Sequence, residues 1–382
     1  MKQGVLLLNF LFIGYFSIGL SAQKTETVFD RKVNFIDLAR QVPMVPRLEE
    51  TLGLCGRYEM VNGVNLWVET QGEGTPIVLV SGGPGTSHHY FHPHFQAVTS
   101  FSEVIFYDLR GVGLSDYSSG NSTYSIDQAV DDLEQLRQKL GHDRWVVLGL
   151  SFGGVIAQMY ALKYPESLEG MVLLSSALPM SLDIGLGSRQ YEFLSEEEKN
   201  KIASIYSIAG QRVAPVHTEF VSPELQRKML YNAFSNGDWK RRHLKKWSQE
   251  EIAQYACYEF VHAKGYYQAM LGDYFEYDLK DLFKTFPVPT LIIEGKWDLA
   301  YSAEKAQIMF EQFPNAQQEY WENSGHIVFE DEPKRFYQTL QKFLTNLKPV
   351  PKKDLKNWKG KTLEVFYRKP NELQRGFMRR RE

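Results

Sequence analysis

The chain has 382 residues, of which 43% are hydrophobic and 14% aromatic, so it can bury a large core and is not intrinsically disordered. Its formal net charge of −3 gives no overall basic footprint for nucleic acid, and its two cysteines exclude a disulfide scaffold or a multi-thiolate zinc site. At roughly 150 residues per domain, the length predicts two domains or one large domain with an insertion.

The N-terminal segment is typical of a secretory signal. Lys2 gives a short positive start, residues 5–20 are mainly apolar, and Ser21-Ala22-Gln23 offers small residues to a signal peptidase. The apolar run is slightly short for a membrane span of about 20 residues, although an uncleaved anchor is the alternative. We therefore expect a signal peptide over 1–22 and a secreted or periplasmic protein with no stable membrane insertion after cleavage.

Strands of two kinds follow. Residues 57–61 and 64–68 flank Asn62-Gly63, a strong tight-turn signal that predicts a hairpin. Later apolar runs are short, which is typical of strands buried on both faces of a sheet. These runs are 77–80, 104–107, 145–148, 171–174 and, after a long gap, 290–293.

A helix is predicted between the runs 104–107 and 145–148. Apolar residues recur there at helical spacing from Ile126 to Leu140, and Gly141 closes the helix. Strands that alternate with helices predict an α/β fold with a mostly parallel sheet covered by helices. The stretch 178–286 is too long for a connection, and we interpret it as a mainly helical cap inserted into the sheet domain.

The strongest chemical signal is Gly149-Leu150-Ser151-Phe152-Gly153-Gly154. It directly follows the strand predicted at 145–148 and precedes a helical run. A serine on such a strand-to-helix turn has its hydroxyl exposed at the end of the strand, and the glycines are needed because a Cβ would clash there. This context favours a nucleophile over an ordinary connecting turn.

A serine nucleophile needs a base, and the base needs an acid to orient it. Asp298 follows the strand at 290–293, and His326 follows a strand predicted at 318–321. The chain order Ser151, Asp298, His326 therefore predicts a nucleophile, an acid and a base, all in loops after strands of one sheet.

A second glycine-rich segment, Ser81-Gly82-Gly83-Pro84-Gly85, follows the strand at 77–80. Closely spaced glycines let a backbone N–H point into a site and stabilise an oxyanion, and we assign this role to the N–H groups of Gly83 and Phe152. A phosphate-binding loop is the alternative, but the Lys-Ser/Thr that such a loop requires is missing.

Together these motifs resemble the α/β-hydrolase fold superfamily over about residues 58–344. The segments 82–85, 108–115 and 149–154 resemble the prolyl aminopeptidase (proline iminopeptidase) branch. The resemblance implies Ser151 as nucleophile, His326 as base and Asp298 as acid, a largely helical cap, and no metal or organic cofactor.

The resemblance also implies roles for other residues. The segment 108–115 is expected to shape the loop beneath the oxyanion site, with Arg110 as an ion-pair anchor. The branch binds the free amino terminus of its substrate with cap glutamates, and Glu259 is the candidate here. Ser81 stands where the branch usually has His, and Phe152 where it often has Trp.

Two features fall outside this pattern. Four neighbouring histidines could bind a metal, but they have no nearby Cys and no HExxH pattern, so we expect them at the pocket mouth or on the surface. They are His88, His89, His92 and His94.

The segment 347–382 carries 12 Lys and Arg against 4 Asp and Glu. We favour a solvated tail over a strap docked on the acidic body or on an anionic surface, because the segment opens with the linker-like Lys348-Pro349-Val350-Pro351.

The predicted organisation comprises a signal peptide (1–22), an N-terminal extension (23–55), two parts of the α/β-hydrolase core (56–177 and 287–346), the cap (178–286) and the basic tail (347–382).

The predicted function is that of a serine hydrolase that forms an acyl-enzyme, most simply an aminopeptidase that releases an N-terminal residue such as proline from short peptides. A carboxylesterase or lactonase acting on small esters is the alternative. A non-catalytic binding protein is disfavoured because no triad member is missing. The oligomeric state and the bonding of Cys55 and Cys257 stay open.

Overall fold

The computed structural model describes residues 56–92, 94–117, 124–176, 178–179, 262–263, 265–296, 298, 301 and 303–368. It also describes the backbone of β1 (Glu26–Val28) and β2 (Arg31–Val33), which pair antiparallel. The predicted signal peptide, Glu259, both cysteines and most of the predicted cap lie outside the described residues.

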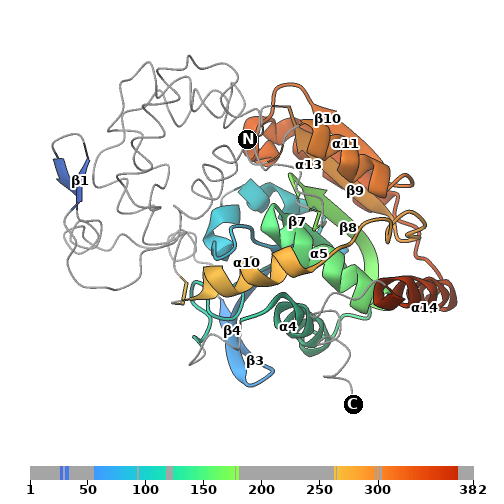
Figure 1. The fold of residues 1–382 in the computed structure, drawn as a ribbon, viewed down its shortest axis with the longest axis horizontal. Helices are drawn as coiled ribbons and strands as arrows, with labels where there is room; N and C mark the ends of the chain where they lie inside the picture. The colour runs from blue at the N-terminus through green and yellow to red at the C-terminus, as the bar shows by residue number, and fades with distance from the viewer. Residues whose placement is uncertain are drawn as a thin grey trace.

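An eight-stranded sheet forms the centre of the molecule, in the order β10-β9-β8-β7-β5-β6-β4-β3 (Figure 1). All neighbours pair in parallel except β3 with β4 and β4 with β6. Every strand predicted from the sequence is present. The strands are β3 (Arg57–Val61), β4 (Val64–Gln71), β5 (Pro76–Val80), β6 (Glu103–Tyr107), β7 (Trp145–Leu150), β8 (Leu168–Leu174), β9 (Thr290–Gly295) and β10 (Gln317–Trp321).

Helices cover both faces of this sheet, as predicted. Along β7, Val147 belongs to one apolar cluster while Val146 and Leu148 belong to the other, because successive side chains of a strand point to opposite faces. The first cluster includes residues of α4 (Ile126–Lys139), α5 (Phe152–Lys163), α10 (Tyr266–Glu276), α11 (Ala303–Gln312) and α14 (Lys352–Arg368). The second includes residues of η1 (His88–Phe91), η2 (His94–Ser100), α12 (Val328–Asp331) and α13 (Pro333–Thr345).

The last part of the predicted cap segment packs on the sheet domain. Asp273 in α10 accepts a hydrogen bond from the backbone N–H of Ile126 at 2.9 Å. Val112 forms an isolated β-bridge with His262, and the N–H of Ala263 donates to the carbonyl of Gly111 at 2.7 Å. The chain therefore re-enters the sheet domain beside the loop 108–115. Within the described ranges, none of the helices is long and apolar enough to cross a bilayer.

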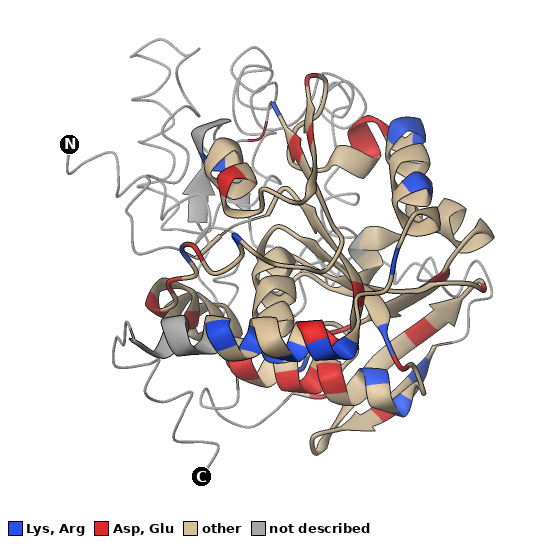
Figure 2. Ribbon diagram, turned by 90° about the vertical axis from the view of Figure 1, so that its right-hand side faces the viewer, with Lys and Arg blue, Asp and Glu red and all other residues tan. Residues whose placement is uncertain are grey.

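The C-terminal helix α14 contradicts the expectation of a solvated tail over Lys352–Arg368. Leu355 and Trp358 are buried, and the Trp358 ring lies 4.8 Å from that of Phe286 between ring centroids. Lys352 pairs with Asp143 at 2.7 Å. Lysines recur along the helix (Figure 2), but the residues on its apolar side are buried. The burial of this side favours a docked helix over a solvated tail.

Replacing Trp358 by alanine is expected to lower the free energy of unfolding by about 3–5 kcal/mol, because it deletes a buried aromatic side chain and leaves a cavity. Urea unfolding followed by circular dichroism measures the change. Lys353→Ala, at an exposed position of the same helix, is the control and should shift stability by no more than about 0.5 kcal/mol. Equal stability of the two variants would contradict a stabilising role for the docked helix.

Candidate active site

Ser151 lies on a sharp turn between β7 and α5. Its backbone has φ 55° and ψ −119°, a left-handed conformation that costs free energy for a residue with a Cβ. Its N–H donates to the carbonyl of Leu174 at 2.9 Å, and its own carbonyl accepts the N–H of Gly154 at 3.0 Å. The turn predicted around Ser151 is therefore present, with the serine between the end of the strand and the first turn of the helix.

Close backbone packing explains why this turn needs glycine. A Cβ on Gly153 would lie 2.1 Å from the carbonyl oxygen of Val80, at the end of β5. A Cβ on Gly149 would lie 2.5 Å from the carbonyl oxygen of Gly153. Both distances are far below van der Waals contact, so a side chain on Gly153 would force the turn away from β5, and one on Gly149 would force β7 away from the first turn of α5.

The loop that follows β5 lies against Ser151. A Cβ on Gly82 would meet the Cβ of Ser151 at 3.0 Å, and Gly83 has φ +107°. The loop is held by the Ser81 hydroxyl, which donates to the carbonyl of Thr86 at 2.6 Å. Among the described residues, no hydrogen bond is found from the N–H of Gly83 or of Phe152, the two groups predicted to bind an oxyanion. His262 covers this loop, because a Cβ on Gly85 would lie 2.8 Å from its ring.

The predicted acid and base are in contact. Asp298 follows β9, His326 follows β10, and the Oδ2 atom of Asp298 lies 2.8 Å from Nδ1 of His326. The Asp298 side chain is 1% exposed and the His326 side chain 18%. The loop before His326 is fixed from α12, where Asp331 accepts the N–H of Gly325 at 2.8 Å. A buried carboxylate at Nδ1 leaves Nε2 of the imidazole to exchange a proton with a nucleophile.

Sequence reasoning missed Tyr301, which contacts both the predicted acid and the predicted base. Its backbone N–H donates to Oδ1 of Asp298 at 3.1 Å, and its ring centroid lies 5.8 Å from that of His326. Burial raises the pKa of the Tyr301 hydroxyl well above its usual value, so the group stays neutral. An aromatic residue three positions after an aspartate carries no sequence signal for such a role.

A second carboxyl near Asp298, that of Glu294, is kept neutral by its surroundings. Glu294 is buried in β9, and burial followed by the charge of Asp298 raises its pKa well above the usual range. Burial lowers the pKa of Lys305 to about 8. A neutral Glu294 cannot stabilise an imidazolium by its charge, whereas the carboxyl of Asp298 contacts His326 directly.

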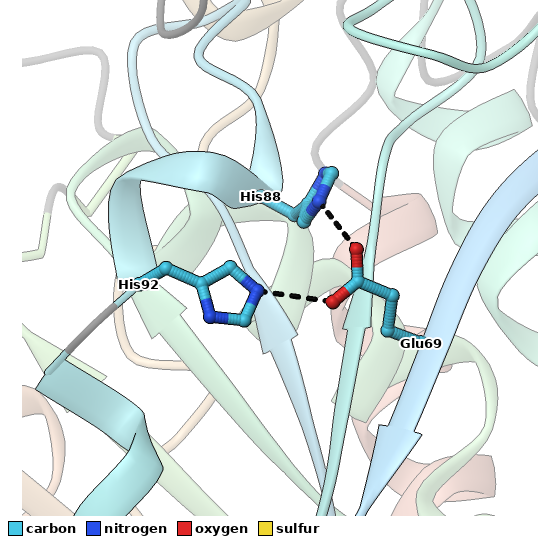
Figure 3. Close-up of side chains that lie close together, drawn as sticks. All are labelled: Glu69, His88 and His92. Carbon is cyan, nitrogen blue, oxygen red and sulfur yellow. Dashed lines mark hydrogen bonds and ion pairs between the residues drawn. The ribbon is translucent and has the colours of Figure 1, made fainter. Parts of the chain in front are cut away.

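The histidine cluster is more buried than the sequence suggested. His88 and His92 are buried, which contradicts the expectation of a surface or pocket-mouth position for these two residues. Their Nε2 atoms lie 2.9 and 3.0 Å from separate carboxylate oxygens of Glu69 in β4 (Figure 3). Nδ1 of His88 lies 2.9 Å from Asp108, which also accepts the backbone N–H of His88. The network thus ties the end of the glycine-rich loop to two strands.

Glu69, His88 and His92 are the one group in the described part of the chain whose ligand atoms lie close enough to hold a metal ion. Each Nε2 atom, however, already faces its own oxygen of Glu69. The carboxylate of Asp108, followed by hydrogen bonding to Glu69, offsets the cost of burial and raises the pKa of His88 to about 10. A protonated imidazole cannot ligate a metal, so we interpret the group as a buried ion network.

The neighbouring segment 108–115 behaves as expected from the sequence. Arg110 forms two hydrogen bonds of 2.8 Å to the carboxylate of Asp132 in α4 and donates to the carbonyl of Asn62. This bidentate pair anchors the loop to the helix and to the β3–β4 turn. Asp108 accepts the N–H of Leu114 at 2.8 Å, so the same carboxylate holds both the loop and His88.

Comparisons with known proteins agree with this geometry. A family model described as "alpha/beta hydrolase fold" matches residues 75–333. A proline iminopeptidase of Saccharolobus solfataricus is 28% identical over 291 residues, which is 75% of this chain and 91% of that protein. One of Clostridium botulinum is 28% identical over 277 residues, or 72% of this chain and 92% of that protein.

Solved structures share the fold at lower identity. An alpha/beta fold family hydrolase from Bacillus anthracis has a TM-score of 0.56 and 22% identity, covering 77% of this chain and 99% of its own. An enol-lactonase from Burkholderia xenovorans has a TM-score of 0.54 and 23% identity, covering 76% and 100%. An esterase from Exiguobacterium antarcticum has a TM-score of 0.54 and 22% identity, covering 76% and 100%.

Proposed function

The chain belongs to the alpha/beta hydrolase fold family, and on that premise we propose that it is a serine hydrolase with Ser151, His326 and Asp298 as its triad. Ser151 Oγ attacks the substrate carbonyl carbon while His326 takes its proton. The N–H groups of Gly83 and Phe152 stabilise the oxyanion. His326 then protonates the leaving group, and water hydrolyses the acyl-enzyme on Ser151.

One observation carries this proposal: the 2.8 Å contact between His326 and Asp298, which come from loops after two neighbouring strands. The contact fixes the imidazole through Nδ1, as a general base requires. Ser151 stands on the same sheet in the backbone conformation typical of a nucleophile turn. Tyr301, whose N–H donates to Asp298 and whose ring lies beside that of His326, supports the arrangement of the acid and the base.

For the substrate, we propose a short peptide with a free amino terminus, from which the enzyme releases an N-terminal residue such as proline. The similarity to proline iminopeptidases over most of the chain supports this choice. A carboxylesterase or lactonase is the second candidate, because an esterase and an enol-lactonase share the fold. An ester substrate needs no carboxylate to bind an amine, whereas an aminopeptidase does.

Purified protein is expected to cleave prolyl and alanyl anilides with a free amino group, and to lose at least about 10-fold in kcat/KM when that group is acetylated. Acetylation removes the charge that a buried carboxylate would recognise, and a lost charge-assisted hydrogen bond costs about 1.5–3 kcal/mol. Release of the aniline is followed by absorbance, with acetyl and butyryl esters measured in parallel.

Ser151→Ala serves as the blank in each assay, so that contaminating hydrolases are recognised. Cleavage of esters alone, with no turnover of the free-amine anilides, would reject the aminopeptidase and favour the esterase. Equal cleavage of free and acetylated anilides would also reject it, because an aminopeptidase must distinguish them.

A further inference from the structure

The loop that carries His326 is closed by a side chain of the helix that follows it. The helix α12 begins two residues after His326, at Val328. The carboxylate of Asp331, its last residue, turns back and accepts the backbone N–H of Gly325 at 2.8 Å. This hydrogen bond ties the residue before His326 to the end of the helix after it. His326 therefore lies within a closed turn of the chain.

The same helix is anchored in the core of the molecule. Val328 and Phe329 are fully buried and belong to the second apolar cluster. A neighbouring carboxylate, that of Glu332, accepts the hydroxyl of buried Ser324 at 2.8 Å. Because a close-packed core resists displacement, the backbone group that Asp331 holds is fixed relative to the sheet.

The other side of Gly325 lies against the turn that carries the acid. A Cβ on Gly295, the last residue of β9, would lie 2.1 Å from the carbonyl oxygen of Gly325. The carbonyl of Gly295 in turn accepts the N–H of Asp298 at 3.3 Å. Gly325 is thus held by α12 through its N–H, while its carbonyl packs on the turn of the acid. A shift of Gly325 would therefore alter the 2.8 Å contact between His326 and Asp298.

We propose that Asp331 is a positioning residue of this site, which sets the place of His326 by holding the backbone N–H of Gly325. The inference rests on the proposed function, because it takes His326 as the base. Misplacing a reacting group by about 1 Å can cost about 100-fold in rate. Loss of the acceptor at position 331 is therefore expected to slow proton transfer from Ser151 and to leave the binding of a reagent unchanged.

The test uses an alkyl fluorophosphonate, which phosphonylates an activated serine and needs no knowledge of the substrate. The serine oxygen bonds to phosphorus, fluoride leaves, and the proton of the serine passes to His326. For Asp331→Ala, we expect the maximal rate constant of labelling to fall about 10-fold, as for a displacement of the imidazole smaller than about 1 Å. The half-saturating probe concentration should stay unchanged.

Asp331→Asn separates the hydrogen bond from the charge. The amide oxygen of asparagine accepts the N–H of Gly325 as a carboxylate oxygen does, but it carries no charge. This variant should label within about threefold of the wild-type rate. Glu322→Ala is the matched control, because it removes a carboxylate from the same loop where the side chain is 64% exposed and pairs with Lys296. It should label at the wild-type rate.

Melting temperatures of all variants show whether folding is preserved. An Asp331→Ala protein that labels as fast as the wild type overturns the inference, and so does an effect confined to the half-saturating concentration. A loss of more than about threefold in Asp331→Asn also overturns it, because the charge would then matter and not the acceptor. This last comparison decides alone if Asp331→Ala does not fold. Failure of the proposed function is seen separately, as labelling of Ser151→Ala at the wild-type rate.

Discussion

Replacing Ser151 by alanine is expected to lower kcat/KM at least about 1,000-fold for whichever substrate the protein hydrolyses, because removing a triad nucleophile leaves only the oxyanion donors and substrate binding. The free energy of unfolding should change by less than about 1 kcal/mol. Serine and alanine both carry a Cβ, so the strain at φ 55° is the same in the two proteins. Steady-state kinetics and urea unfolding measure the two effects.

Ser176→Ala is the matched control for this substitution. Ser176 is a buried serine just beyond the end of β8, where its hydroxyl oxygen lies 3.3 Å from the amide nitrogen of Gln158. Its loss removes one hydroxyl near the same helix without touching the proposed triad, so turnover should stay within about threefold of wild type. If Ser151→Ala protein free of contaminants retains a tenth of the wild-type activity, another residue is the nucleophile.

The strands and the nucleophile turn could be predicted because their signals are local. Strands buried on both faces are continuous apolar runs, as in Ile77, Val78 and Leu79. The glycines around Ser151 mark a turn whose close backbone packing leaves no room for a Cβ. The chain order of Ser151, Asp298 and His326 then places these residues at the ends of strands, and a parallel sheet brings those ends to one edge.

The features that the sequence did not predict depend on distant partners. The sequence predicts His88 at the pocket mouth or on the surface, because nothing near it in the chain indicates its partner Glu69 in β4. The sequence favours a solvated tail because the segment opens with the linker-like Lys348-Pro349-Val350-Pro351, whereas Trp358 of α14 packs on Phe283 and Phe286. Tyr301 is identified only by the atoms that it contacts. Composition and spacing do not encode such contacts, so these sites require coordinates.

The second prediction with a large effect concerns the ion network around His88 and the stability of the fold. His88 is 1% exposed and lies between the carboxylates of Glu69 and Asp108. Replacing it by glutamine removes the positive charge and leaves the two carboxylates buried without it. Breaking a buried ion pair in this way costs about 3–5 kcal/mol, and we expect a loss of that size in the free energy of unfolding at pH 6.

The stability lost in His88→Gln should become smaller as the pH rises. The pKa of His88 is raised to about 10 in the folded protein, against about 6.5 for an unperturbed histidine. The folded state therefore binds more protons than the unfolded state between these values, and the stability contributed by His88 falls as the pH rises through this range. The difference in unfolding free energy between wild type and His88→Gln should be largest below pH 6.5 and shrink toward pH 10.

Urea unfolding of both proteins at intervals from pH 6 to pH 10 measures this difference directly. His142→Gln is the matched control, because its pairing partner is Glu103 at 3.8 Å and the two side chains are 17% and 24% exposed. A partly exposed pair of this kind is worth no more than about 1 kcal/mol, so this variant should remain close to wild type. A difference between wild type and His88→Gln that stays constant from pH 6 to pH 10 would mean that His88 is not protonated in the folded protein. In that case Glu69 and Asp108 would be bound by a neutral imidazole, and the network would hold the glycine-rich loop by hydrogen bonds alone.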